Sequence, residues 1–534
     1  MINKSARWGL VATLLIAAAP GCGENQPART EHPVSGNPPG LEGNTVGRIY
    51  WMGKKRLGIV AGAYFFMRLW ELPQAKALEA QTLDKLASAP WRMGSPDAAP
   101  TNAPVSALRN LFEDVLQEET YLEIRHPEGQ FGSAVFAIRL DDTRAGVWQT
   151  NLMEVVQSLT RGSTATGQGR GWSIKLDAAP RLIGLTREGR WTLVSQGQDG
   201  ASLVNEFVQR IRGGGTPVPA GITNSWIEVE AVPSRAIPAV CPGVNIPGGV
   251  ERVQLSVTGD GAALDTAGSI KFDHPLNLAV EPWNVPTNLM RGPIASLTAC
   301  RGFGPVLAAM PGVSNWFTGI GALPNQLFIW TGNRSPLAVC VAAPEPDARG
   351  VVERLTDQLV GQGNAWLNAH SGGSFQRLPD GRGVTWAGIP MSAPYITAPE
   401  NSPGWLFGEL IQPENSPTTG GAVPEQVNAI LGRTNLVYYN WDYTAPRMST
   451  SLYLAQLVRI VSKHPQLAME TRAEGCVSAL ASRLDNSETV ITMSGPDDLK
   501  LARHSTVGLT ALELNLLAGW LELPEFPFGW DKLP

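Results

Sequence analysis

The sequence predicts an α+β protein in which hairpins build antiparallel sheets and amphipathic helices pack on one face of them. Strand patterns come in pairs joined by glycine turns, and helical patterns follow these pairs. The strict strand–helix alternation of a doubly wound parallel sheet is not seen. The 534 residues are 43% hydrophobic and 17% charged, which is typical of a folded, lightly charged protein. At roughly 100–200 residues per domain, this length predicts more than one domain.

The first 21 residues have the pattern of an export signal. Lys4 and Arg7 precede an uncharged run that ends at Ala19, and Pro20-Gly21-Cys22 follows it. A run of about twelve apolar residues is too short to span a ~30 Å hydrocarbon core permanently. Gly21 before Cys22 resembles a bacterial lipoprotein signal, in which the cysteine thiol takes a lipid before cleavage. Cleavage after Ala19 without a lipid is the alternative.

Lipidation of Cys22 would make residues 22–47 a flexible tether. Pro27, Pro33, Pro38 and Pro39 lie in this stretch without an apolar period, which predicts an extended chain. We therefore expect an exported protein that is periplasmic or associated with the outer membrane through its lipid anchor. The membrane would then be one of its partners.

A second apolar run extends from Leu57 to Met67. Its eleven residues are too few to span a membrane. We expect a buried first helix or strand pair that leads into Trp70.

Composition argues against nucleic acid as a partner. Without residues 1–21 the chain carries 40 basic and 47 acidic residues, and these are scattered rather than clustered. Four cysteines follow the signal, and sequence cannot choose among their three possible pairings. Cys340 lies in an apolar run and is expected to be a buried thiol. The four are Cys241, Cys300, Cys340 and Cys476.

Alternating apolar residues predict the strands. Ala134, Phe136, Ile138 and Leu140 share one face of a strand. Hairpins are expected over 181–195, 253–270 and 327–341, with turns at Glu188-Gly189, Asp260-Gly261 and Gly332-Asn333.

Helices are predicted where apolar residues recur at i, i+3, i+4 and i+7. Capping boxes at Thr471 with Glu474 and at Thr510 with Glu513 mark two helix starts. The segment from Leu509 to Leu523 is apolar almost all round and is expected to be deeply buried. The helical stripes are Leu152/Val155/Val156/Leu159, Val204/Phe207/Val208/Ile211, Leu454/Leu457/Val458/Val461, Val477/Leu480/Ala481/Leu484 and Val352/Leu355/Leu359.

The order strand, strand, helix recurs at 121–159, 182–211 and 327–360, which suggests duplicated ββα units. Stretches rich in Pro and Gly mark candidate boundaries. A cut near Gly292 gives an N-terminal α+β domain over 48–292 and a C-terminal one over 293–534.

The usual catalytic and cofactor motifs are absent from the sequence. We therefore assign no catalytic, cofactor-binding or metal-binding residue. His370-Ser371 and Asp497-Asp498 are weak acid–base candidates. A surface loop and a local cap explain them more simply.

One aromatic segment is a candidate binding site. As a strand, 438–443 places Tyr439, Trp441 and Tyr443 on one face, and Tyr438, Asn440 and Asp442 on the other. An aromatic stripe beside Asn and Asp can stack on sugar rings or grip a peptide. Core packing is the competing interpretation.

Several runs resemble a family of uncharacterised exported bacterial proteins, some of them possible lipoproteins. The resemblance covers most of the chain after residue 48, implies export and one continuous architecture, and assigns no activity. The runs are 66–73 (FMRLWELP), 78–86 (LEAQTLDKL), Pro90-Trp91, 436–441 (LVYYNW) and 509–513 (LTALE).

Two functions follow from these patterns. The first is an exported, lipid-anchored envelope protein with a non-enzymatic role in binding or scaffolding a protein, glycan or lipid. It predicts an exposed apolar or aromatic surface on one sheet face. The alternative is a hydrolase of an envelope polymer whose residues converge between the two halves.

Overall fold

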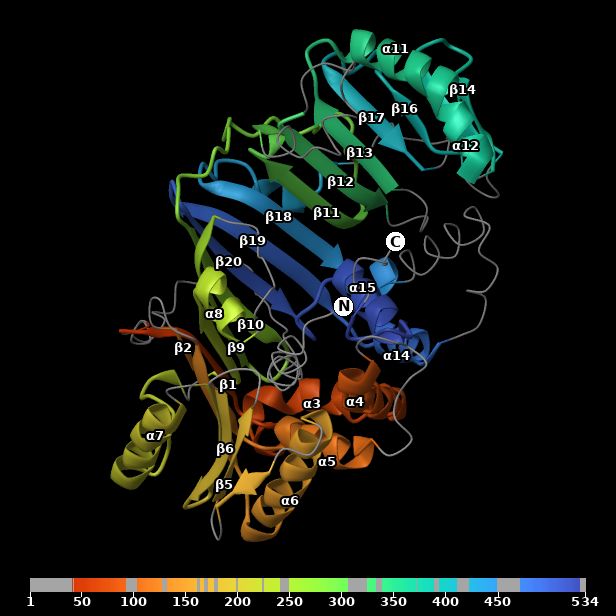
Figure 1. Cartoon of the computed structure of the whole chain (residues 1–534). Helices are drawn as coiled ribbons and strands as arrows, with labels where there is room; N and C mark the ends of the chain where they lie inside the picture. The colour runs from red at the N-terminus through yellow and green to blue at the C-terminus, as the bar shows by residue number, and fades with distance from the viewer. Residues whose placement is uncertain are drawn as a thin grey trace. The chain divides into compact units, whose positions relative to one another are not determined.

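The computed structural model describes most of the chain after residue 40, and it divides into two compact units (Figure 1). Unit 1 comprises residues 1–274, 506–508 and 516–534, and unit 2 comprises residues 275–505 and 509–515. The cut expected near Gly292 lies inside unit 2. The described residues are 41, 43–92, 103–126, 132–160, 164–167, 171–176, 181–197, 200–222, 225–240, 249–305, 324–332, 339–370, 372–388, 393–410, 422–448 and 471–528.

Unit 1 is built on an antiparallel sheet in the order β10-β9-β8-β1-β2-β3-β7-β6-β5-β4. β1 begins at Thr45, so the last residues of the range assigned to the tether form a strand. The strands are β1 (Thr45–Trp51), β2 (Thr120–Arg125), β3 (Ser133–Arg139), β4 (Ala165–Thr166), β5 (Gly171–Leu176), β6 (Arg181–Glu188), β7 (Trp191–Gly197), β8 (Ile227–Ala231), β9 (Val250–Gly259) and β10 (Leu264–Phe272).

Short helices precede the long ones in unit 1. The sequence predicts a buried helix or strand pair for the run from Leu57 to Met67. The run is mainly helical. Ile59 and Tyr64 are 86% and 63% exposed, however, so the run as a whole is not buried. The helices are α2 (Lys54–Leu57), η1 (Ala61–Ala63), α3 (Tyr64–Trp70), α4 (Pro73–Arg92), α5 (Val105–Gln117), α6 (Asp142–Leu159), α7 (Gly200–Gly214) and α8 (Pro233–Val240).

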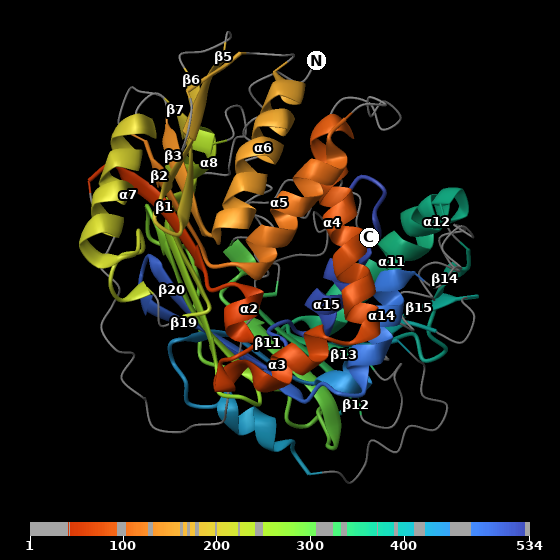
Figure 2. The same ribbon diagram turned by 90° about the horizontal axis from the view of Figure 1, so that it is seen from below.

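Helices cover both faces of the unit 1 sheet, which corrects the expectation of one covered face. Figure 2 shows α4, α5 and α6 on one side of the strands and α7 on the other. Leu122 and Phe136 pack in the cluster with α5 and α6, whereas their neighbours Tyr121 and Val135 pack in the cluster with α7. Successive strand residues point to opposite faces. β2 and β3 are therefore buried almost continuously, like strands covered on both sides.

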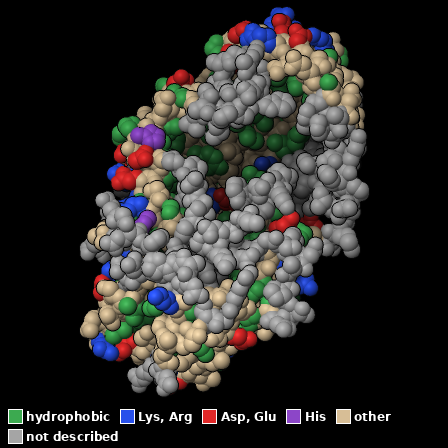
Figure 3. All heavy atoms as spheres, viewed as in Figure 1, with side chains coloured by type: hydrophobic (Ala, Val, Ile, Leu, Met, Phe, Trp, Pro, Cys, Tyr) green, Lys and Arg blue, Asp and Glu red, His purple; other side chains and the backbone are tan. Residues whose placement is uncertain are grey.

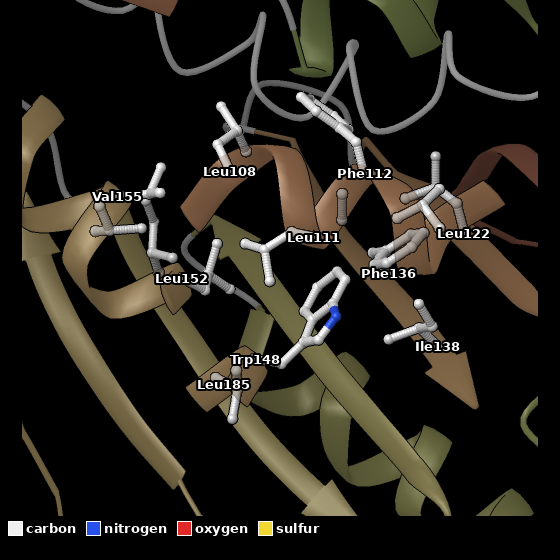
Figure 4. Packing of buried hydrophobic residues seen from close by; sticks show 14 of the residues in the cluster. Leu108, Leu111, Phe112, Leu122, Phe136, Ile138, Trp148, Leu152, Val155 and Leu185 are labelled. Atoms are coloured by element: carbon white, nitrogen blue, oxygen red, sulfur yellow. The ribbon is translucent and has the colours of Figure 1, made fainter. Parts of the chain in front are cut away.

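The larger core of unit 1 is centred on Trp148, which is fully buried (Figure 4). Its ring stacks on Phe136 with centroids 6.1 Å apart, and its indole N–H donates to Asp114 Oδ2 at 2.8 Å. Arg144 also donates to Asp114, with Nη2 2.6 Å from Oδ2. The buried carboxylate thus has charged and neutral donors, as a buried charge requires.

The strands of unit 2 pair antiparallel in the order β20-β19-β18-β11-β12-β13-β17-β16-β15-β14. The strands are β11 (Ile294–Arg301), β12 (Gln326–Gly332), β13 (Val339–Pro344), β14 (Ser374–Arg377), β15 (Gly383–Ala387), β16 (Tyr395–Thr397), β17 (Trp405–Glu409), β18 (Leu436–Tyr443), β19 (Asn486–Gly495) and β20 (Asp498–Ser505).

The helices of unit 2 follow its strand pairs. α15 begins in unit 2 and continues in residues that belong to unit 1. The elements are α11 (Ala348–Gln358), the π-helical turn η3 (Leu359–Gly363), α12 (Asn364–His370), the 3₁₀ turn η4 (Glu425–Ala429), α14 (Arg472–Ala481) and α15 (Ala511–Glu522).

The two strand orders correspond position by position, with β1 to β10 matching β11 to β20. The described helices also match in part. α6 follows β3 as α11 follows β13, and α8 follows β8 as α14 follows β18. A mixed fold with extensive antiparallel sheet, as predicted, is therefore confirmed.

Some of the local predictions are confirmed and one is wrong. The capping boxes at Thr471 and Thr510 are present, and the stripes of α6 and α7 are buried. Deep burial of the last helix is wrong, because Leu512 is 58% and Leu516 41% exposed. A helix can be apolar all round and still lie at a surface when it serves as cover for one face only. The stripe starting at Leu454 lies outside the described residues.

Candidate functional site

The sheet of unit 2 has one well-packed face. Leu297, Ala299, Phe328 and Trp330 are at most 3% exposed and belong to the core cluster of the unit. Because strand residues alternate between faces, the residues between these four point the other way. We call this second side the open face. It comprises Thr298, Cys300, Leu327, Ile329, Val339, Val341, Ile396, Tyr438 and Asn440.

Apolar side chains of the open face are partly exposed. Leu327, Ile329, Val339 and Val341 are neither fully buried nor members of a described core cluster, and Ile396 is 36% exposed. In the view of Figure 3, hydrophobic side chains are visible at the surface of unit 2.

The matching strands of unit 1 show how such a face is normally covered. On β2 and β3, Leu122, Ile124 and Ile138 are at most 5% exposed. Leu108 and Phe112 of α5 pack on them. In unit 2, the described helices α11 and α12 lie over one end of the sheet and leave β12 and β13 partly exposed (Figure 1).

One row of paired residues crosses the open face from apolar to polar. From β16 to β19 the directly opposed residues are Ile396, Gly408, Val341, Ile329, Thr298, Asn440 and Thr489. Strands lie about 4.8 Å apart, so Val341 and Asn440 are separated by roughly 14 Å. The row thus places aliphatic side chains at one end and hydrogen-bonding groups at the other.

The polar end is a buried hydrogen-bonded cluster. Asn440 Nδ2 donates to Thr298 Oγ1 at 2.8 Å. On the next strand Arg503 Nε donates to Thr489 Oγ1 at 2.9 Å, and Arg503 Nη2 lies 2.5 Å from Glu513 Oε1. Glu513 is held at the start of α15 by its capping box with Thr510. The helix start therefore fixes a carboxylate beside the sheet.

Asp442 is the most perturbed carboxyl of this cluster. It is 2% exposed, and burial raises its pKa to about 6, although hydrogen bonds from the Thr444 hydroxyl at 2.6 Å and from the backbone N–H of Ala511 oppose the rise. Arg447 lies near enough to lower the pKa of Asp442, and burial lowers the pKa of Arg447 itself. Both charges are thus poorly solvated.

Three buried polar atoms here have no hydrogen-bond partner among the described residues. They are Asn440 Oδ1, Ser487 Oγ and Arg447 Nη1. Asn440 is 8% and Ser487 0% exposed, and Ser487 pairs with Asp442 across the β18–β19 ladder. Buried polar atoms are nearly always satisfied, and Asn440 is the residue among these three that lies in the cross-strand row.

The predicted aromatic stripe lies mainly on the packed face. Tyr439 is 2% exposed and belongs to the core cluster, Trp441 packs against that cluster, and Tyr443 is 44% exposed at the strand end. Burial and the neighbouring Glu488 raise the pKa of Tyr439. Only Tyr443 therefore presents an aromatic ring freely to solvent.

The strand register of this segment is as expected, but its other three residues, Tyr438, Asn440 and Asp442, build the candidate site. Sequence inspection missed the apolar end because Leu327, Ile329 and Val341 look like ordinary strand residues. Their alternation with Phe328 and Trp330 is the sequence pattern from which a second, apolar face of these strands could have been predicted.

The remaining candidates do not form a site. Cys22 and Ser371 lie outside the described residues, as do the side chain of His370 and all of Cys241. Asp498 accepts a hydrogen bond from Ser494 in the β19–β20 hairpin, far along the strand from His504. Cys300, Cys340 and Cys476 are free thiols, and burial raises the pKa of Cys300 to about 11.

The described residues contain neither a candidate metal cluster nor a candidate membrane-spanning helix. No group of three His, Cys, Asp or Glu side chains there could hold a metal ion. In the same part of the chain, no helix combines the length and apolar character needed to cross a membrane.

Comparisons with known proteins assign no family to this chain. No protein-family model matches the chain, and no curated protein does either. Among solved structures, it is similar to a chain titled "Structure of crystal form III of TP0453", with 7% identity and a TM-score of 0.24, over 44% of this chain and 80% of that one. A likeness at this level carries no argument about fold or function.

Proposed function

We propose that the protein is exported, held at an envelope membrane by a lipid on Cys22, and acts by binding rather than by catalysis. The open face of unit 2 is the observation that carries the binding role. Its aliphatic side chains stay partly exposed where the matching side chains of unit 1 are buried. Contiguous exposed apolar surface is typical of a site that a ligand or partner covers.

The anchor rests on the sequence alone. Lys4, Arg7, the apolar run and Gly21-Cys22 support it, and the runs that resemble exported bacterial proteins agree with it. The anchor would leave the folded units in an aqueous compartment, either the periplasm or the region next to the outer membrane.

Intact mass and detergent phase partitioning test the anchor. The mature protein from its host of origin is compared with a Cys22→Ala variant. A lipid-sized mass increment and membrane association in the wild type, both lost in the variant, are expected. A mature chain that starts at Pro20, carries no added mass and stays in the aqueous phase would contradict the anchor.

We further propose that the chain is an internal duplication. The support is the identical pairing order of strands β1–β10 within unit 1 and β11–β20 within unit 2. The ββα segments at 121–159 and 327–360 then occupy corresponding places, β2-β3-α6 and β12-β13-α11. The repeating block is accordingly larger than the ββα unit that the sequence suggested.

A hydrolase acting on an envelope polymer is the second candidate, and Asp442 is the observation that favours it. A carboxyl with a pKa of about 6 can both give and take a proton near neutral pH. Its 2% exposure weighs against direct contact with a polymer. Release of soluble fragments from envelope polymers by the wild type, lost in Asp442→Asn, would favour this function over binding.

A further inference from the structure

We propose that the open face binds a lipid, with an acyl chain lying across β13 and β12 and a polar head group next to Asn440. This ligand class rests on the proposed binding role and is independent of the anchor at Cys22.

The floor of the site suits a methylene chain. Between Ile396 and Thr298 the cross-strand row consists of Gly408, Val341 and Ile329, all uncharged. The space above Gly408 is already occupied, because a Cβ there would meet the Tyr395 carbonyl oxygen at 3.1 Å and Ile396 Cγ1 at 3.5 Å. The floor that an acyl chain could cover is therefore formed by Val341 and Ile329, and covering it would remove aliphatic surface from water.

The polar end supplies a hydrogen-bond acceptor. Asn440 lies in the row opposite Thr298, and its Oδ1 has no partner among the described residues. A head group with a hydroxyl could donate to this oxygen. Pairing a buried polar atom is favourable, because leaving it unpaired costs free energy.

The gradient from apolar to polar distinguishes a lipid from other ligands. A glycan would need accessible rings, but Tyr439 is in the core on the opposite face and Trp441 packs against it. A protein partner needs a broad accessible surface, whereas Leu327, Ile329 and Val341 are only partly exposed. An amphiphile matches both ends of a row roughly 14 Å long, which is three strand spacings.

Unit 1 shows the same packing made with protein side chains. Leu108 and Phe112 of α5 belong to the same buried cluster as Leu122 and Ile124 of β2. An acyl chain on β12 and β13 would give Leu327 and Ile329 the equivalent cover.

The test uses the full-length chain with Cys22→Ala, so that failure of the anchor does not affect it. The polyene fatty acid cis-parinaric acid is the probe, and its fluorescence rises when it enters an apolar site. Ile329→Glu places a charge on the floor, and Ile329→Trp fills the floor without adding charge. Leu431→Glu is the matched control, because Leu431 is apolar, 47% exposed and outside the open face.

The wild type is expected to bind the probe saturably, with phosphatidylglycerol vesicles displacing it. Both Ile329 variants should weaken binding at least tenfold, which corresponds to about 1.4 kcal/mol, and Leu431→Glu should leave it unchanged. Circular dichroism checks folding, and Ile329→Trp decides the question if Ile329→Glu unfolds. No saturable binding by the wild type, or equal binding by all four proteins, would overturn the proposal. Crosslinks from position 329 to another segment of the chain, or to another protein, would also overturn the proposal, because they would show that something other than the probe occupies the face.

Discussion

Asn440 lies directly opposite Thr298 in the β18–β11 ladder and donates Nδ2 to its hydroxyl at 2.8 Å, while its own Oδ1 has no partner among the described residues. This half-satisfied amide marks the point where the apolar floor of the open face becomes polar. The two residues thus link the packing of the sheet to the proposed head-group site.

Asn440→Ala separates a binding role of this amide from a structural one. The variant loses one hydrogen bond but also removes a buried, unpaired carbonyl, and these effects oppose each other. Unfolding free energy is expected to change by no more than about 1 kcal/mol, while the affinity for cis-parinaric acid falls several-fold. Urea unfolding and probe titration measure the two. A large loss of stability with unchanged affinity would make Asn440 a purely structural residue.

Asp442→Asn should change the pH dependence of stability. The folded pKa of about 6 lies above the unfolded value of about 3.9. The folded state therefore holds the proton more tightly, and the contribution of Asp442 to stability is lost as pH rises from about 4 through 6. The asparagine variant lacks this loss, so its unfolding free energy relative to that of the wild type should rise by up to about 3 kcal/mol between pH 4 and pH 7. Parallel urea titrations of both proteins across this range check it, and identical pH slopes would contradict the assignment.

Trp148→Ala should destabilise unit 1 strongly. The change leaves a large cavity beside Phe136 and removes a donor from Asp114, so a loss of about 3–5 kcal/mol is expected. Trp148→Phe keeps most of the apolar volume and should cost clearly less. Thermal and urea unfolding give the comparison, and equal losses for the two variants would argue that the indole hydrogen bond dominates.

Thr471→Ala should weaken the start of α14. The Thr471 hydroxyl accepts a hydrogen bond from the backbone N–H of Glu474 at 3.1 Å, and the Glu474 carboxylate accepts one from the backbone N–H of Thr471. Loss of the cap is expected to cost about 1 kcal/mol, and Thr471→Ser should recover most of it. An alanine variant as stable as the wild type would mean that packing alone positions this helix.

Local features of the fold could be predicted from the sequence. The hairpin of β6 and β7, the hairpin of β9 and β10, and both capping boxes depend on residues that are neighbours in the chain, so their patterns are legible. The covering of both faces of the unit 1 sheet by helices could not be predicted from the sequence. The run from Ala134 to Ile138 is apolar at every position, and only the packing of α7 shows that both of its faces are covered.

The candidate site was predictable only in part. Alternation correctly separated Tyr439, Trp441 and Tyr443 from Tyr438, Asn440 and Asp442. Which of the two sets would face the core depends on long-range packing against Phe328 and Trp330, which strand propensity does not encode. Aromatic character alone cannot separate a binding stripe from core packing, because large rings also favour sheet cores, and Tyr439 lies in the core as the competing interpretation expects.

The most direct test of the binding account is to measure what the protein carries when it is purified from its host of origin. Native mass spectrometry is applied to the Cys22→Ala protein and to the same chain with Ile329→Glu or Leu431→Glu. The account predicts one non-covalently bound acyl lipid on the first and third proteins and its loss from the second. The absence of lipid from all three, or an equal amount on each, would contradict it.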